Sequence, residues 1–223
     1  MRSEILEAPG KHRHSATAGS AAAQAYESIR DRIISLALPP GAPLNEGELV
    51  GQLGVGLTPV RDAIKRLALE HLIIVYPRRG TFVSEINLAD ERWLTEARVE
   101  MEGLAAELGA ARASVEERRA IKECVEMLLT ESQQLRINAL DTEFHRLIYR
   151  AAHNPFLEAS LNQYLNLSVR LWYYCRDRLR PKATNGDFHQ QVADAILAGD
   201  AQAARAGIVA HLKQSSIELR EVM

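Results

Sequence analysis

The chain is short of cysteine, of aromatic side chains and of long apolar runs. Its 223 residues include two cysteines, Cys124 and Cys175, with no CxxC pairing. This argues against a disulfide framework and fits a reducing compartment. No apolar run reaches the ~18 residues that span a bilayer, and the N-terminus lacks the apolar core of a secretory signal. We therefore expect a cytoplasmic protein with no membrane partner.

Aromatic residues make up 5% of the chain, and the formal net charge is -2 at pH 7. Because alanine is abundant while aromatic residues are scarce, we expect helices packed on helices rather than a large β-sheet. A chain this close to neutrality is not a general coat for nucleic acid, so any DNA contact must come from a local basic patch. The length allows one large domain or two small ones.

Residues 1–20 are polar and small, with the run Lys11-His12-Arg13-His14 in their middle. We interpret them as a disordered, solvated tail in preference to a histidine metal site. From Ala21 onward, apolar residues recur at three-to-four spacing, as on one face of a helix. The folded part is therefore expected to begin at Ala21.

Residues 21–85 combine helical segments with a hairpin. The first helix is expected to end at Leu38-Pro39-Pro40-Gly41, and Asn45 can cap a second, short helix. Thr58 is predicted to cap a third helix, with Pro59 at its first position. A hairpin should follow, with its strands and turn at Leu72–Tyr76, Pro77–Gly80 and Thr81–Val83. This order is the outline of a winged helix-turn-helix.

Residues 86–223 show no further strand signals and predict an all-α antiparallel bundle. The six expected helices are Leu88–Ala113, Val115–Gln133, Ala139–Ala152, Phe156–Leu179, Phe188–Ala198 and Ala201–Val222. Ser114 with Glu117 forms the pattern of a capping box, and Asp187 and Asp200 are expected helix caps. The predicted fold class is mainly α: a winged helix-turn-helix followed by about six bundled helices.

The third helix carries the residue types that read DNA. Thr58, Arg61 and Lys65 lie opposite its apolar face, and Arg61 and Lys65 are one turn apart. Arginine can make two hydrogen bonds to guanine in the major groove, whereas Lys65 and Arg66 are expected to contact phosphate. A solvated basic helix face is the plainer alternative for this helix taken alone.

The predicted hairpin adds a second basic feature directly after this helix. Arg78 and Arg79, followed by Gly80, form its tip, where they can enter the minor groove or contact its edges. A basic helix face followed at once by a basic hairpin tip favours DNA binding over the solvated-face alternative.

These segments together resemble the GntR family of bacterial regulators. The resemblance rests on Leu38-Pro39-Pro40-Gly41-Ala42-Pro43-Leu44-Asn45-Glu46, Leu57-Thr58-Pro59-Val60-Arg61-Asp62-Ala63-Ile64-Lys65-Arg66-Leu67 and Pro77-Arg78-Arg79-Gly80-Thr81-Phe82-Val83. The family usually has Ser-Arg where this chain has Gly56-Leu57, so we expect a different operator sequence or affinity. It also usually has glycine at His71, where a left-handed conformation ends the helix.

Four residues of the helical half are candidate metal ligands. Asp141 and His145 are four residues apart on one predicted helix, and His189 and His211 lie on two helices that a tight turn joins. Three imidazoles and a carboxylate suit zinc, nickel, cobalt or manganese. Spacing alone leaves open a set of unrelated histidines, with His145 exposed and His211 in the core.

The helical half also resembles the FadR-type, or FCD, C-terminal domain. The similarity lies in Asp141-Thr142-Glu143-Phe144-His145 before His153-Asn154-Pro155, and in the spacing from His189 through Gly199-Asp200 to His211. This resemblance implies that Asp141, His145, His189 and His211 are the ligands. It also implies that Arg98 lies near an effector, although Glu102, one turn on, could make Arg98 purely structural.

We therefore interpret the chain as a DNA-binding transcription regulator, and the resemblance makes repression the expected sign. Its expected partners are double-stranded operator DNA, a second copy in a homodimer, and a small effector that bears a carboxylate. A metal-dependent hydrolase or lyase is one alternative, although the sequence has no HExxH, phosphate loop or nucleophile elbow. A second alternative is a regulator whose helical half only dimerises.

Overall fold

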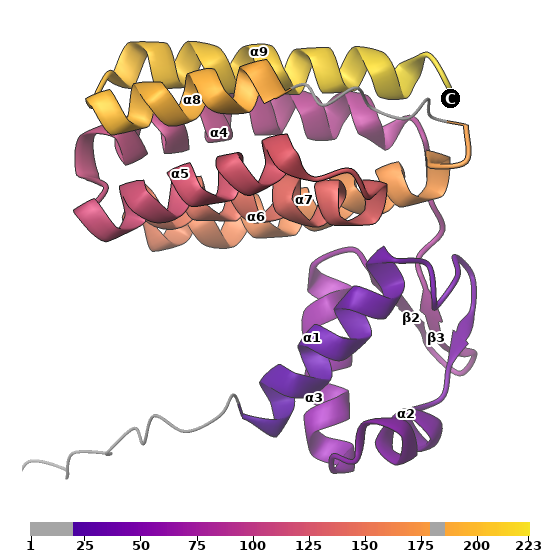
Figure 1. The fold of residues 1–223 in the computed structure, drawn as a ribbon. Helices are drawn as coiled ribbons and strands as arrows, with labels where there is room; N and C mark the ends of the chain where they lie inside the picture. Colours follow the sequence, from indigo (N-terminus) through magenta and orange to yellow (C-terminus); the bar gives the residue numbers. More distant parts are fainter. Residues whose placement is uncertain (1–19, 179–185) are drawn as a thin grey trace, which may run out of the picture.

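The structure is a computed structural model that describes residues 20–178 and 186–223 (Figure 1). The expected tail at residues 1–19, the expected helix end at Leu179 and the break at Arg180-Pro181 lie outside the described residues, as does the side chain of Asp187. The N-terminal elements are α1 (Ala21–Ile34), β1 (Pro43–Leu44), α2 (Glu46–Leu53), α3 (Leu57–Leu69), β2 (Ile73–Tyr76) and β3 (Gly80–Val83). The helices that follow are α4 (Asp90–Arg112), α5 (Val115–Thr130), α6 (Gln134–Ala151), α7 (Pro155–Cys175), α8 (Gly186–Ala198) and α9 (Ala201–Arg220).

The N-terminal elements form a winged helix-turn-helix, as predicted. The described sheet has the order β1-β3-β2, and both pairs are antiparallel. Ile73 pairs with Val83 and Tyr76 with Gly80, so β2 and β3 form the expected hairpin. Strand β1 was not predicted, because a strand of two residues is too short to show an alternating pattern.

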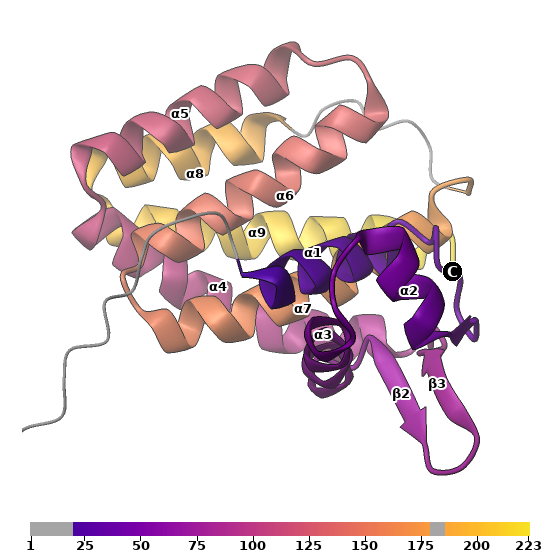
Figure 2. The same cartoon turned by 90° about the horizontal axis from the view of Figure 1, so that it is seen from below.

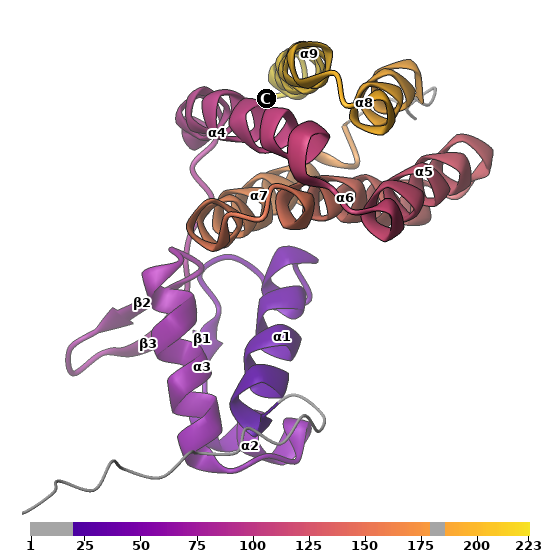
Figure 3. The same ribbon diagram turned by 90° about the vertical axis from the view of Figure 1, so that its left-hand side faces the viewer.

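The core of this module lies between α1 and α3. The apolar stripe expected on the first helix is buried at Tyr26, Ile29 and Ile33, and α3 buries Ile64 and Leu67 against it. The exposed face of α3 is therefore the one that points away from α1. Figure 3 shows α3 between α1 and the β2–β3 hairpin, so that this exposed face and the hairpin share a side of the module.

The six later helices form the predicted bundle, with α4 packed against α6, α7, α8 and α9. Small residues of α4 such as Ala105, Ala106 and Gly109 are buried there and let the neighbouring helices approach closely. Figure 3 shows α7 on the side of the bundle that faces the N-terminal module, and α7 contacts α1. Within the described residues, no helix is long and apolar enough to cross a membrane.

Several predicted helix ends are confirmed. Ser114 and Glu117 form the capping box, the Asp200 side chain accepts a hydrogen bond from the Ala203 N–H, and Asn45 caps α2. The expected start of the third bundle helix at Ala139 was late, because α6 begins at Gln134. Its N-cap makes no side-chain hydrogen bond that the sequence could have shown.

The prediction that Thr58 caps the third helix was wrong. The helix begins at Leu57, and Gly56 occupies the capping position in an extended conformation without any side-chain bond. Thr58 and Pro59 are therefore the second and third helical residues. Proline is tolerated there because the first four N–H groups of a helix have no partner within it.

Candidate DNA-reading surface and candidate metal centre

The face of α3 that is turned away from α1 carries exposed polar residues along about its first two and a half turns. Thr58, Arg61 and Lys65 are all exposed, as the amphipathic pattern predicted. Arg61 Nε lies 2.8 Å from Glu46 Oε2, and Lys65 Nζ lies 3.4 Å from Asp62 Oδ1. Exposed ion pairs of this kind contribute little to stability. Both cations can therefore exchange these partners for phosphate or a base edge at small cost.

Arg66 lies apart from this face. Its Nε donates to Glu70 Oε1 at 3.0 Å, and its guanidinium carbon lies 3.6 Å from the centre of the Tyr26 ring. The Tyr26 hydroxyl donates to the other oxygen of Glu70 at 2.7 Å, and Glu70 is buried. Arg66 thus braces α3 against α1 through its Nε and the face of its guanidinium, while its side chain remains 60% exposed.

The tip of the β2–β3 hairpin presents two arginines to solvent. The Arg79 N–H donates to the Tyr76 carbonyl at 3.1 Å, and Arg78 has a φ of 64°. Proline at the second position and a positive φ at the third are the features of a type II turn. Arg78, Arg79 and Gly80 are exposed, and the hairpin projects away from the helices (Figure 2).

His71 adopts the left-handed conformation in which glycine was the expected residue. Its φ is 61°, and it lies between the end of α3 and the start of β2. The Leu72 N–H returns to the Leu67 carbonyl at 3.0 Å and closes the helix end. The chain therefore ends α3 in the left-handed conformation that glycine usually adopts, although this conformation is strained for a residue with a Cβ such as His71.

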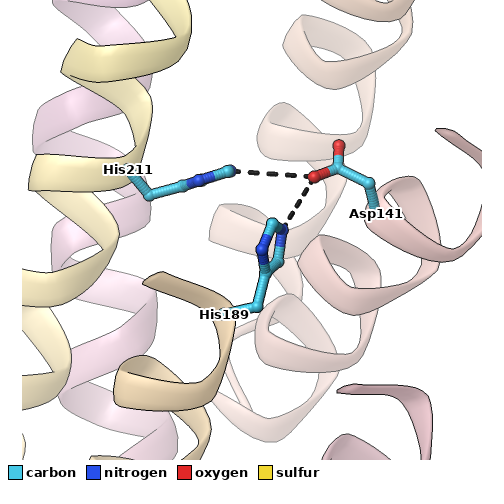
Figure 4. A group of neighbouring side chains, drawn as sticks. All are labelled: Asp141, His189 and His211. Carbon is cyan, nitrogen blue, oxygen red and sulfur yellow. Dashed lines mark hydrogen bonds and ion pairs between the residues drawn. The ribbon is translucent and has the colours of Figure 1, made fainter. Parts of the chain in front are cut away.

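Three of the four predicted metal ligands come together inside the bundle. Asp141 lies on α6, His189 near the start of α8 and His211 midway along α9 (Figure 4). One carboxylate oxygen of Asp141 lies 2.8 Å from His189 Nε2 and 3.8 Å from His211 Nε2. One potential ligand atom from each residue lies within 4.8 Å of the others, and both histidines are buried.

This donor set fits a small divalent transition metal. Two ligand atoms that are each about 2.1 Å from one ion can be no more than about 4.2 Å apart. Both distances from Asp141 Oδ1 to the histidine nitrogens meet this limit. The Asp141, His189 and His211 side chains could therefore hold such an ion after small side-chain adjustments.

His145 lies beside this cluster and is oriented by Glu102. Its ring centre is 5.3 Å from that of His211, and its Nδ1 lies 2.6 Å from Glu102 Oε2. A carboxylate on one ring nitrogen of a histidine fixes the tautomer and leaves the other nitrogen to bind metal. From the sequence, Glu102 was expected to pair only with Arg98. Its contact with His145 joins two helices and therefore leaves no signal in local spacing.

Arg98 and Glu102 form a buried ion pair behind His145. Arg98 Nε donates to Glu102 Oε1 at 2.6 Å, and both side chains are buried. Burial alone would raise the pKa of Glu102, but the charges of Arg98 and His145 outweigh it and lower this pKa to about 2. Arg98 therefore fits a structural role, because it pairs with Glu102. It also fits a role near an effector, because it lines the cavity beside Asp141, His145 and His211.

The cavity beside the cluster is small. Its volume is about 40 Å³, and its walls include Arg98, Asp141, His145 and His211. A water molecule takes about 30 Å³ of the liquid, whereas metabolite pockets usually measure about 300–1,000 Å³. The space in this conformation suits an ion with little solvent.

The fold and these two sites define a class: a DNA-binding regulator with a winged helix-turn-helix and a helical domain that contains a candidate metal centre. The family model for "Bacterial regulatory proteins, gntR family" matches residues 21–83, and the model for the FCD domain matches residues 93–214. The chain belongs to the GntR family of bacterial transcription regulators, in its FCD-containing, FadR-like branch.

Similar proteins of this class are transcription regulators. The chain is 30% identical over 198 residues to the "Probable D-xylose utilization operon transcriptional repressor" of Paenarthrobacter nicotinovorans, a match that covers 88% of this chain and 87% of the relative. It is 25% identical over 202 residues to the repressor RspR of Escherichia coli, with 89% of each covered. The solved structure of E. coli McbR/YncC has a TM-score of 0.79 at 22% identity, covers 92% of this chain and 99% of its own, and shows the shared fold.

These matches also decide between the regulator and the enzyme alternative. The relatives are named as regulators or repressors of transcription, so the chain is a regulator rather than a hydrolase or lyase. Within the bundle, Glu143 is the acidic residue two positions from Asp141. Its carboxylate pairs with Arg150 at 2.6 Å on an exposed face, where it is not placed to act as a general base.

Proposed function

We propose that this chain is a repressor that binds operator DNA as a homodimer and is controlled by a small carboxylate at a metal centre in the helical domain. Residues 21–85 would read the operator, and residues 86–223 would sense the effector and dimerise. The observation that carries the sensing half of this proposal is the convergence of Asp141, His189 and His211 from three helices. Repressor names among the relatives support the sign of regulation.

The metal would be held by Asp141, His189 and His211, with His145 as the fourth ligand. The hydrogen bond between Glu102 and His145 Nδ1 directs the other ring nitrogen of His145 away from Glu102. When bound, a divalent ion supplies positive charge that attracts a carboxylate oxygen of the effector. Zinc, nickel, cobalt and manganese all accept this mixture of nitrogen and oxygen ligands.

Arg98 is proposed as the second group that recognises the effector. It is fixed by Glu102 and lines the same cavity as Asp141 and His211. Because this cavity measures about 40 Å³, a metabolite can enter only if the surrounding helices move apart. A ligand that requires such movement favours one arrangement of the bundle over another, and this preference is what allows it to shift a conformational equilibrium.

Helix α7 is the proposed connection between the cavity and the wing. One face of α7 contributes Ser168 and Trp172 to the wall of the metal-centre cavity. On another face, Arg170 Nη1 donates to Ser84 Oγ at 2.8 Å and Nη2 to the Ser84 carbonyl at 2.6 Å. Ser84 directly follows β3, so a displacement of α7 reaches the DNA-reading module through these two hydrogen bonds.

The metal centre can be tested by elemental analysis of the purified chain and of two histidine variants. We expect about one transition-metal ion per wild-type chain, and a loss of metal affinity of at least about tenfold in His189→Ala. His153→Ala is the matched control, because His153 is an exposed histidine that pairs with Glu117 outside the cluster. Stoichiometric metal in His189→Ala would show that the ligand set is wrong.

The effector can be sought by measuring thermal unfolding of the metal-loaded protein with small carboxylates. A ligand that binds only the folded state raises its stability in proportion to occupancy. We expect at least one carboxylate to raise the unfolding temperature of the wild type and not that of His189→Ala. A chain that holds no metal and responds to no carboxylate would instead favour a helical domain that only dimerises.

A further inference from the structure

A second cavity, much larger than the one at the metal centre, lies between the wing and the helical domain. Its volume is about 390 Å³, and it is lined from the N-terminal side by His71, Ser84 and Ile86, and from the helices by residues such as Trp93 and Arg170. This volume falls within the range of about 300–1,000 Å³ that is usual for small-molecule sites, which often lie at domain interfaces.

Most of the wall of this interdomain cavity is apolar. Ile86 lies on the linker, Leu94 and Ala97 on α4, and Leu167 and Leu171 on α7. Trp93 also lines this wall, and it is 62% exposed. Such a surface favours the apolar body of a ligand, because covering it removes apolar area from water.

The cation in this wall, Arg170, has little compensation for its charge. Arg170 is 3% exposed, and its two hydrogen bonds to Ser84 use two of the five N–H donors of a guanidinium. Its Nε has no acceptor, and within the described residues no carboxylate forms an ion pair with it. Burial lowers the pKa of Arg170 to about 10 against the opposing effect of Glu85, so it remains charged at neutral pH.

Two acidic residues, Glu85 and Asp90, also line the interdomain cavity. Asp90 Oδ1 accepts a hydrogen bond from Asn87 Nδ2 at 2.9 Å. Glu85 is exposed and lies against the turn at Gly41, where an added Cβ would come 2.5 Å from Glu85 Oε1. A buried cation needs an anionic partner to offset its desolvation, and neither carboxylate makes that contact with Arg170.

We propose that the interdomain cavity is a second ligand site, which takes a small monocarboxylate with an apolar or aromatic body. The carboxylate compensates the charge of Arg170, and the apolar body lies against Trp93 and Leu94. This site is separate from the metal centre and does not depend on it. Because Arg170 also holds Ser84 at the end of β3, a ligand there acts directly on the connection between α7 and the wing.

Phenylacetate is a suitable probe, titrated by calorimetry into the full-length chain and into His189→Ala. The variant is included because a carboxylate could also bind a metal ion, and binding that survives in His189→Ala is binding elsewhere. We expect saturable binding to both proteins. Neutral phenylacetamide should bind about tenfold more weakly or worse, since it lacks the charge that Arg170 selects. Absence of binding by phenylacetate, or its loss in His189→Ala, would overturn the proposal.

Two variants test the position of the probe. Ala97→Phe fills the cavity without touching a charge, and Arg170→Gln removes the cation; each should weaken phenylacetate binding by about tenfold or more. Arg92→Gln is the matched control, because Arg92 is an exposed residue of α4 that pairs with Glu96. If Ala97→Phe binds phenylacetate as the wild type does, the site is elsewhere. If phenethylamine binds in preference to phenylacetate, Glu85 and Asp90 determine the selectivity and the proposal is wrong.

Discussion

The candidate DNA-reading surface and the surroundings of the candidate metal centre use charged residues in opposite ways. In the N-terminal module, Arg61 and Lys65 on α3 and the arginines at the hairpin tip are exposed, and the partners Glu46 and Asp62 are half-buried and exposed, respectively. In the helical domain, Arg98 and Glu102 are buried and paired with each other. Exposed charges are free to take a new partner such as DNA, whereas buried charges are part of the fold and bind a ligand only by rearranging it.

The largest effect expected from this difference is on Glu102. Glu102→Gln removes the charge that compensates Arg98 and orients His145, and it leaves a buried cation behind. Breaking a buried pair in this way typically costs about 3–5 kcal/mol of stability. Urea unfolding of the metal-free protein should show a loss of this size.

Glu100→Gln on the same helix is the control for Glu102→Gln. Glu100 is 75% exposed and pairs with Arg205 at 3.0 Å, and an exposed pair is worth about 0–1 kcal/mol. If the two variants lose the same stability, burial is not what distinguishes the Arg98–Glu102 pair from an exposed pair.

The next effect is a pH dependence that comes from Glu91. Its carboxylate accepts hydrogen bonds from Ser216 at 2.6 Å and Thr95 at 2.8 Å, and it pairs with Arg220, so it ties the start of α4 to the end of α9. Burial alone would raise the pKa of Glu91, but these three partners outweigh it and lower the pKa below its usual 4.5.

A carboxyl whose pKa is lowered in the folded state stabilises the fold above its unfolded pKa, and this stabilisation is lost as the pH falls. At pH 7, Glu91→Gln should therefore be less stable than the wild type by about 1–3 kcal/mol. The gap in unfolding free energy should shrink as the pH falls below about 4.5. A gap that stays constant down to pH 3 would contradict the role given to Glu91.

Much of the fold was predictable because it depends on local patterns. The apolar stripe of α1, the capping box at Ser114 and the caps at Asn45 and Asp200 are determined by residues within a few positions of one another. The start of α3 was predicted too late in the chain. Gly56 occupies the capping position, and glycine has no side chain that would mark it as a helix cap. Strand β1 forms only because β3 lies beside it.

Three of the four candidate ligands lie together as expected, whereas the contacts that support them were not predicted. Asp141, His189 and His211 come together as the family resemblance implied. The bond from Glu102 to His145 and the bonds from Arg170 to Ser84 join residues 43 and 86 positions apart. Their existence depends on how helices pack, which no spacing in a single sequence records. The bracing of Arg66 against Tyr26 depends on the same kind of contact between helices.

The smallest expected effect is at the hairpin tip. Arg79→Ala should weaken binding to all DNA sequences alike and reduce the slope of log affinity against log salt by about 1, if Arg79 contacts one phosphate. Arg78→Gly removes the other tip charge while keeping a residue suited to the positive φ of 64° at this position. Each variant therefore removes a charge without straining the turn. An unchanged salt slope in both would exclude the tip from the interface.

The most direct test of the account is the affinity of the wild type and Arg61→Ala for a duplex that the wild type selects from a random pool. Arg92→Ala serves as a control, since Arg92 is also an exposed arginine and lies on α4 of the other half. The account predicts that Arg61→Ala loses about 1–3 kcal/mol of binding free energy and discriminates less between bases, while its metal content stays that of the wild type. Equal affinity and equal base preference in Arg61→Ala and the wild type would contradict the claim that α3 reads the operator.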